Sequence, residues 1–206
     1  MFRTRVKICG ITNVEDALMA IDAGADALGL VFYPPSPRYV DLDTAAAIRR
    51  AVQPFVTLVG LFVNAPADDI RAAIDCAQLD LLQFHGDESE SACTCFGRPY
   101  IKALRVREGE TLEPLIASYS SAQGILLDTY VENVPGGTGR QFDWRLFPQK
   151  SSKPLILAGG LDAQNVSEAI RSTHPYAVDV SGGVEASKGR KDEFKLRQFI
   201  REVAGE

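Results

Sequence analysis

Short apolar runs alternate with amphipathic segments along the whole chain. Eight of these runs predict β-strands, at 4–9, 26–32, 56–63, 79–84, 99–104, 123–128, 154–158 and 176–181. Between most of them, apolar residues recur at helical spacing, over 14–21, 44–52, 68–77, 162–171 and 192–203. Two further helices are expected to be short, at 112–117 and 143–147. Eight strands that alternate with helices in 206 residues predict an α/β fold, a single (β/α)8 barrel of the TIM type, in one domain over 1–206.

Composition and charge narrow the class of protein. The chain is 46% hydrophobic and 24% charged, which is typical of a globular protein with a sizeable core. The net charge of -5 argues against a nucleic-acid partner, whereas an anionic small molecule is compatible with it, because local N–H groups and arginines can outweigh the overall charge. No run reaches membrane-spanning length and the first residues lack the pattern of a signal peptide. We therefore expect no membrane association and a cytoplasmic location.

The cysteines and histidines show no pattern typical of a metal site. Cys93 and Cys95 stand without a second pair or a nearby histidine, and the chain has only two histidines. We therefore expect no metal, and free thiols as in a reducing compartment.

The first predicted strand ends in a cysteine, at the place where the loops of such a barrel carry its chemistry. Cys9 shares its side of the strand with Lys7, so we expect Cys9 at the barrel mouth and the ammonium one layer below. A nearby ammonium favours the thiolate and would make Cys9 a base or a nucleophile. Two alternatives stay open: Cys9 as a small buried apolar side chain, and Lys7 paired with Asp179 on the neighbouring last strand.

Two more ionisable side chains end predicted strands. Asp128 follows the apolar run 124–127, and a carboxyl at that position is capping, paired or catalytic as a general acid. His85 ends the fourth strand and is expected to line the same mouth, with a turn histidine bonded to backbone as the alternative.

Three loops after strands carry residues suited to anions. Arg38 closes the proline-rich loop 33–38, which would hold its planar guanidinium in place for a carboxylate or phosphate; the alternative is a solvated arginine. Paired glycines follow the seventh and eighth strands, where backbone N–H groups can approach a phosphate closely. Ordinary tight turns are the alternative. The residues expected to bind phosphate are Gly159, Gly160, Ser181, Gly182 and Gly183.

Motifs along the whole chain resemble those of the phosphoribosylanthranilate isomerase family of tryptophan biosynthesis. They lie at 7–12, 36–38, 83–86, 126–128, 137–139, 142–144, 157–161, 179–185, 191–192 and 199–200. The sequence departs from the family pattern twice: Gly182 stands where a second serine is common, and Phe84 where leucine is usual. The first departure removes one hydroxyl donor from the expected phosphate site and leaves its backbone N–H groups.

The resemblance implies an Amadori rearrangement of N-(5-phosphoribosyl)anthranilate with no metal and no organic cofactor. The aspartate that matches Asp128 acts in the family as general acid on the furanose ring oxygen. The cysteine that matches Cys9 acts as general base on the C2 proton. Arg38 would hold the anthranilate carboxylate, and the paired glycines would hold the phosphate.

Two loops are expected to act as lids over such a site. One is loop 34–38 and the other carries Gly137, Thr138 and Gly139. The chain is expected to be a monomer or a homodimer.

Three rival functions are weighed against the same residues. The histidine-pathway isomerase performs the same rearrangement but resembles a two-aspartate design, with an acid where Cys9 stands. A metal-dependent pentose-phosphate epimerase would need histidines on its strands, and this chain has none suitably placed. A catalytically silent phosphate-binding barrel or partner subunit would have no need of both Cys9 and Asp128.

Overall fold

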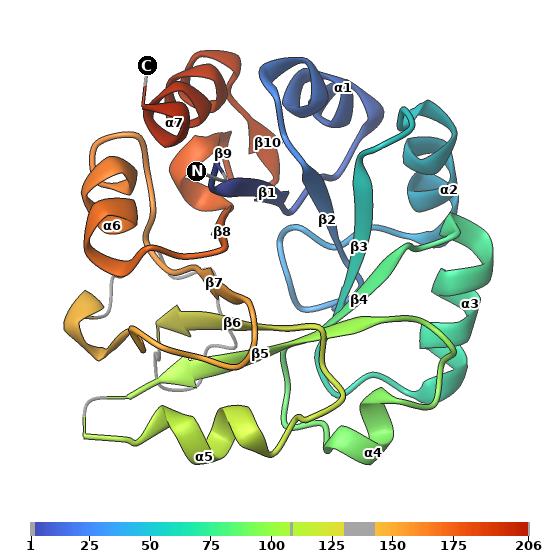
Figure 1. The fold of residues 1–206 in the computed structure, drawn as a ribbon. Coiled ribbons are helices and arrows are strands. Elements are labelled where there is room, and N and C mark those ends of the chain that lie inside the picture. Colours follow the sequence, from blue (N-terminus) through green and yellow to red (C-terminus); the bar gives the residue numbers. More distant parts are fainter. Residues whose placement is uncertain (1–2, 108, 130–142, 206) are drawn as a thin grey trace.

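A closed barrel of eight parallel strands, paired in chain order, forms the centre of the protein (Figure 1). The computed structural model describes residues 3–107, 109–129 and 143–205. The strands are β1 Arg5–Cys9, β2 Ala27–Val31, β3 Thr57–Phe62, β4 Leu81–Phe84, β5 Tyr100–Val106, β6 Gly124–Thr129, β7 Leu155–Leu157 and β8 Ala177–Val180. Pairing of β1 with β8 closes the barrel. Each predicted strand is present, so the predicted (β/α)8 fold is confirmed.

Helices surround the barrel on its outside (Figure 1). They are α1 Val14–Ala23, α2 Leu42–Ala51, α3 Ala67–Ala77, α4 Glu90–Cys93, α5 Leu112–Ala117, α6 Val166–Thr173 and α7 Glu193–Ala204, with the 3-10 helix η1 Trp144–Leu146 before β7. The expected short turn at 143–147 is therefore 3-10. After β8 the chain adds a second 3-10 helix, η2 Gly182–Val184, and a two-stranded antiparallel ribbon, β9 Glu185–Ser187 and β10 Arg190–Lys191. This ribbon and α4 were not predicted.

The predicted start of the sixth helix at Asp162 is wrong by four residues. The carboxylate Oδ1 of Asp162 accepts hydrogen bonds from the backbone N–H groups of Gln164 and Asn165, at 2.9 and 3.1 Å. These bonds close a separate turn ahead of α6, because a short acidic side chain can satisfy local N–H groups without a helix. The turn lies beside the glycine-rich loop that follows β7.

Apolar side chains fill two compartments. The larger lies between the strands and the helices, and it includes fully buried side chains such as Phe62, Phe84 and Phe199. The smaller lies in the barrel interior and is formed by inward-facing residues from β5 to β8. Its members are Ile101, Ala103, Leu126, Ile156, Ala158 and Ala177. Above them, Cys9 packs with Val31 and Leu61 at the carboxyl end of the barrel.

Candidate active site

The candidate residues from four strand ends meet in one cavity of about 180 Å³ at the carboxyl end of the barrel. Cys9, Arg38, His85 and Asp128 all line it, although they are far apart in the sequence. Parallel strands of a closed barrel all end at the same face, so this convergence follows directly from the fold.

Lys7 lies below the cavity and pairs with an aspartate. Its Nζ is 2.7 Å from Oδ1 of Asp179, and both side chains are almost fully buried. The two residues are register partners where β1 meets β8, so the predicted pair is confirmed. Burial would lower the pKa of Lys7, but attraction to Asp179 and to Cys9 outweighs burial and raises that pKa.

The thiol of Cys9 is buried, with 6% of the residue exposed. Burial raises the pKa of Cys9 above its ordinary value, and the nearby ammonium groups of Lys7 and Lys191 only partly offset this effect. The ammonium of Lys7 therefore lowers the pKa of Cys9, which is the predicted direction, but burial of the thiol outweighs it. Desolvation of the buried charge is the larger effect.

Gly29 on β2 gives the thiol its space. A Cβ at this position would lie 2.8 Å from Sγ of Cys9 and 3.1 Å from Nζ of Lys7. We predict that Gly29→Ala displaces the thiol and slows the reaction that the family resemblance implies by about a hundredfold, since a misplacement near 1 Å has that effect. The rate is measured per folded chain, with Gly60→Ala as control, whose Cβ would meet Cδ1 of Leu79 at 2.4 Å outside the cavity. Equal rates for the two variants would contradict the prediction.

Asp128 on β6 is buried, with one carboxylate oxygen hydrogen-bonded to backbone and the other close to a histidine ring. Oδ1 accepts a hydrogen bond from the backbone N–H of Thr129 at 2.7 Å. Oδ2 lies 3.3 Å from Nε2 of His85. Only 6% of Asp128 is exposed, and the residue lines the cavity.

His85 is also buried at the mouth, and its other ring nitrogen is occupied. Nδ1 of His85 lies 3.1 Å from Nε2 of Gln83. When this amide donates to Nδ1, the neutral ring carries its proton on Nε2, the nitrogen that faces Asp128. In spite of that short distance, Nε2 has no hydrogen bond of good geometry within the described part of the chain. It is therefore a buried donor aimed into the cavity.

Arg38 is held by a glutamate that the sequence did not single out as a functional residue. Nε and Nη2 of Arg38 donate to the two carboxylate oxygens of Glu185, at 2.7 and 2.8 Å. This bidentate pair uses one edge of the guanidinium and leaves the edge with Nη1 for another anion. Gly10, whose Cβ would lie 2.5 Å from Cδ of Arg38, leaves room for the arginine stem.

Lys191 joins Glu185 to the strand ends. Its side chain is fully buried, and Nζ donates to the carbonyl of Cys9 at 2.7 Å, to the carbonyl of Ser181 at 3.2 Å and to Glu185 at 3.1 Å. Burial would raise the pKa of Glu185, but Arg38 and Lys191 outweigh it and lower that pKa. The ribbon β9–β10 therefore connects the backbone of Cys9, the guanidinium of Arg38 and the loop after β8. The pair 191–192 is among the motifs that resemble the family, but the sequence does not indicate this role for Lys191.

A second cavity of about 60 Å³ adjoins the first and is lined by the predicted phosphate residues. Gly159 and Gly160 have positive φ angles of 88° and 64°, which glycine adopts at low cost. A Cβ on Gly183 would lie 2.0 Å from the carbonyl oxygen of Leu161, so only glycine fits there. Oγ of Ser181 is buried without a hydrogen-bond partner among the described residues, at the junction of the two cavities.

The predicted lid residues Gly137, Thr138 and Gly139 lie outside the described residues. The other expected lid, loop 34–38, forms turns in which the N–H of Ser36 donates to the carbonyl of Tyr33 and the N–H of Arg38 to Oγ of Ser36. Among the described residues, no three side chains of the metal-binding types gather as a metal site would require. In the same part of the chain, no helix combines the length and apolar character needed to span a bilayer.

A buried thiol, a buried carboxyl and an anchored guanidinium share one mouth, and a glycine-rich cavity adjoins them. Polar side chains gathered at the carboxyl end of the strands are typical of α/β-barrel enzymes. Residues 6–202 match the family model described as N-(5'phosphoribosyl)anthranilate (PRA) isomerase. The chain belongs to this family.

Individual relatives agree over almost the whole length of the chain. The N-(5'-phosphoribosyl)anthranilate isomerase of Pseudomonas fluorescens strain Pf0-1 is 60% identical over 203 residues, which cover 98% of this chain and 100% of the relative. The crystal structure of the Thermotoga maritima phosphoribosyl anthranilate isomerase is 41% identical, with a TM-score of 0.90 and coverage of 98% and 100%.

A further structure shows a phosphoribosyl anthranilate isomerase in complex with reduced 1-(o-carboxyphenylamino)-1-deoxyribulose 5-phosphate. It is 40% identical to this chain, with a TM-score of 0.88, and covers 98% of this chain and 100% of its own.

Proposed function

We propose that this chain isomerises N-(5'-phosphoribosyl)anthranilate to 1-(2-carboxyphenylamino)-1-deoxyribulose 5-phosphate in tryptophan biosynthesis, with Asp128 as general acid and Cys9 as general base. The observation that carries the proposal is the shared cavity of these two groups. An arginine for one end of the substrate lies on one side, and a glycine-lined cavity for the other end adjoins it. The family of the chain gives the reaction, and the geometry supports the roles.

In the first step, Asp128 gives its proton to the furanose ring oxygen. The bond between C1 and that oxygen breaks, and the nitrogen lone pair forms a C1=N double bond, so the open sugar is a protonated Schiff base. A carboxyl held by the N–H of Thr129 on one oxygen has a fixed direction for this transfer.

In the second step, the thiolate of Cys9 takes the proton from C2. The C–H electrons form a C1=C2 double bond and the C=N electrons return to nitrogen, which gives an enolamine. The C2 hydroxyl then loses its proton while C1 gains one, and the product is the ketone. Cys9 and Asp128 line the same cavity, so one bound substrate can reach both the base and the acid.

Turnover needs a protonated Asp128 and an ionised Cys9 at the same time. This is the reverse of the ordinary order of acidity of a carboxyl and a thiol. The burial of Cys9, which raises its pKa, lowers the fraction of the thiolate. The ammonium groups of Lys7 and Lys191 limit the decrease.

The raised pKa of Cys9 predicts slow alkylation of this thiol at neutral pH. Iodoacetamide reacts with the thiolate, and burial disfavours that charged form, so the rate should reach half its maximum above pH 9.0, the ordinary thiol value. Mass spectrometry of the labelled peptides measures the rate, and the exposed thiols Cys76 and Cys95 report the reagent in the same sample. If the alkylation rate of Cys9 levels off below pH 9.0, the ammonium groups of Lys7 and Lys191 have a larger effect on its pKa than burial has.

Arg38 is proposed to bind the anthranilate carboxylate through the guanidinium edge that Glu185 leaves open. The phosphate is proposed to bind in the second cavity, to backbone N–H groups of the loops after β7 and β8 and to Oγ of Ser181. A hydroxyl that is buried without a partner gains a hydrogen bond there. Because Gly182 stands where a second serine is common, the proposed phosphate donors are these backbone N–H groups and the single hydroxyl of Ser181.

Glu185→Gln is predicted to raise KM for this substrate about tenfold, the effect of one lost hydrogen bond to a charged group, with little change in kcat. The amide NH2 would face donors of Arg38 and Lys191, so the guanidinium would lose its fixed position. Asp16→Asn is the control, because the Asp16 carboxylate accepts from the N–H of Lys191 in the same ribbon without contacting Arg38. An unchanged KM in Glu185→Gln would show that Arg38 needs no such support.

Turnover of freshly generated substrate by chelator-treated protein tests the proposed function. Conversion to the deoxyribulose product, identified by NMR, is the expected result. Binding without conversion would favour the silent barrel, and turnover restored only by a divalent metal would refute the proposed chemistry. Conversion of the histidine-pathway aminoaldose in place of this substrate would assign the chain to the other isomerase activity.

A further inference from the structure

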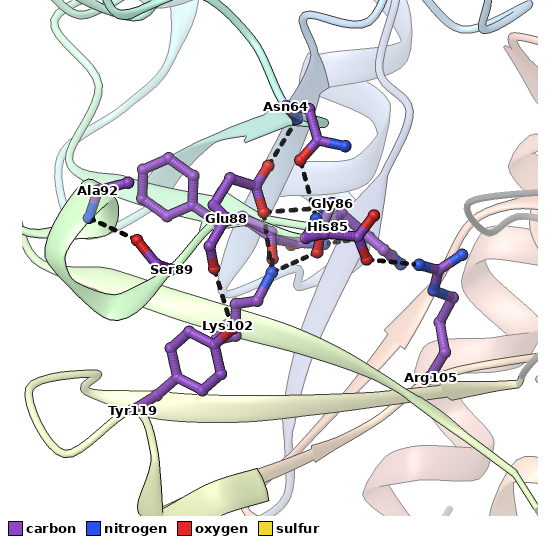
Figure 2. A network of polar contacts seen from close by, with 12 residues as sticks. Asn64, His85, Gly86, Glu88, Ser89, Ala92, Lys102, Arg105 and Tyr119 are labelled. Carbon is purple, nitrogen blue, oxygen red and sulfur yellow. Dashed lines mark hydrogen bonds and ion pairs between the residues drawn. The ribbon is translucent and has the colours of Figure 1, made fainter.

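A buried polar network lies outside the barrel, under the turn that follows β4 (Figure 2). Lys102 on β5 is 1% exposed. Its strand neighbours Ile101 and Ala103 fill the barrel interior, so Lys102 points to the opposite side, toward the helix layer. The Lys102 side chain therefore starts in an apolar layer, where a charged residue is unexpected, and its ammonium group contacts the turn 85–88.

The ammonium of Lys102 binds the backbone on both sides of His85. Nζ donates to the carbonyl of Phe84 at 3.3 Å and to the carbonyl of Gly86 at 2.6 Å. It also donates to Oε2 of Glu88 at 2.8 Å. Because the two carbonyls flank His85 in the chain, one charged group fixes the direction in which the His85 side chain leaves the backbone.

Glu88 completes the network from the other side of the turn. Its carboxylate accepts from the N–H of Asn64 at 2.7 Å and from the N–H of Gly86 at 2.9 Å (Figure 2). Asn64 follows β3, so the carboxylate ties the turn after β4 to the neighbouring strand end. The hydroxyl of Tyr119 donates to the backbone carbonyl of Glu88 at 2.9 Å. A Cβ on Gly86 would lie 2.4 Å from Oδ1 of Asn64, so the turn has no space to shift toward β3.

We propose that Lys102 and Glu88 are a positioning pair that holds His85 against the general acid Asp128. This inference rests on the proposed function. The pair lies behind the turn, His85 projects from the turn into the cavity, and Nε2 of His85 lies 3.3 Å from Oδ2 of Asp128. With Oδ1 held by the N–H of Thr129, the His85 ring lies beside the second oxygen and restricts how far the carboxyl can rotate.

Stability alone does not explain a buried pair of this kind. Removing two charges from water costs free energy that their attraction only roughly repays, and apolar side chains of similar size often stabilise a protein as well or better. An apolar pair could not bind the carbonyls on both sides of His85, nor could it bind the N–H groups of Gly86 in the turn and Asn64 after β3. The distinctive effect of Lys102 and Glu88 is therefore geometric, at the side chain that lies next to the acid.

The test variant is Lys102→Met combined with Glu88→Gln, which leaves no unpaired buried charge and keeps an acceptor for the turn. We expect kcat to fall at least about tenfold with KM nearly unchanged, because orientation of the acid affects the reacting state and not the binding of the substrate ends. The matched control is Asp87→Asn with Arg105→Gln, which breaks an exposed 3.1 Å ion pair on the same turn. Its kcat should stay within about twofold, as for other surface pairs. If the double variant does not fold, Glu88→Gln alone serves, with a smaller expected fall.

A mutant cycle with His85→Gln separates positioning from a general structural effect. If the pair acts through His85, adding Lys102→Met and Glu88→Gln to His85→Gln should lower kcat no further. Losses that multiply, or a kcat that the pair variant leaves unchanged, would overturn the inference.

NMR of the histidine rings tests the same inference without turnover. The chain has two histidines, and His174 lies at the end of α6, away from the network. The ring signals of His85 should move in the pair variant while those of His174 stay in place. Unmoved His85 signals would refute the positioning role. Failure of the unmodified chain to convert the substrate would instead refute the proposed function, and the NMR result would still decide on the pair.

Discussion

Asp128→Asn should lower kcat by about 10²–10⁴-fold, the usual contribution of a general acid. The amide has no proton acidic enough to give to the furanose ring oxygen, so ring opening would depend on water. The change is nearly isosteric, and the amide oxygen can still accept from the N–H of Thr129. Steady-state kinetics with the phosphoribosyl substrate measure the loss, and thermal melting shows whether the fold is intact.

Binding of a product analogue is the control for Asp128→Asn. The reduced deoxyribulose phosphate that binds a 40% identical relative is a suitable probe, because it needs no proton from the acid. We expect its dissociation constant to stay close to that of the unmodified chain. A kcat reduced less than about tenfold, below the range for general acids, would move the acid to another group in the cavity.

Cys9→Ala should also lower kcat by about 10²–10⁴-fold, because no other group would take the C2 proton at the same position. Ring opening comes before this step, so the Schiff base should still form. Quenched samples of the variant should therefore contain open-chain sugar that the unmodified enzyme does not accumulate. The alanine removes one small buried atom, so the barrel should fold normally.

Cys76→Ala is the matched control for the thiol, since Cys76 is exposed on α3. Its kcat should equal that of the unmodified chain. Turnover that survives in Cys9→Ala would keep the reaction but assign the base to another residue.

The barrel could be predicted because its strands are short apolar runs at regular intervals. The site followed from that fold, since Cys9, His85 and Asp128 each end a strand and all strand ends meet at one face. The Lys7–Asp179 pair was predicted from the closure of the first strand onto the last. The spacing of apolar residues is a local property of the sequence, and the closed barrel then determines which strand ends meet. Both can therefore be predicted from one sequence.

The supporting charges could not be predicted, because their partners are brought together only by folding. Glu185 lies 147 positions from Arg38, and Lys191 lies 182 positions from the Cys9 carbonyl that it binds. Lys102 stands between two apolar residues of its strand, a pattern that indicates a solvent-exposed lysine. In the structure Lys102 is buried. The effect of burial on the pKa of Cys9 likewise depends on packing that no sequence pattern reports.

The most direct test of the acid–base account is the position of deuterium in product formed in D2O. Removal of the C2 proton followed by protonation at C1 predicts product with solvent deuterium in its C1 methylene group, seen by proton NMR. Product with an unlabelled C1 would mean that the C2 hydrogen moved directly to C1. That result would contradict the assignment of Cys9 as a base that exchanges its proton with solvent.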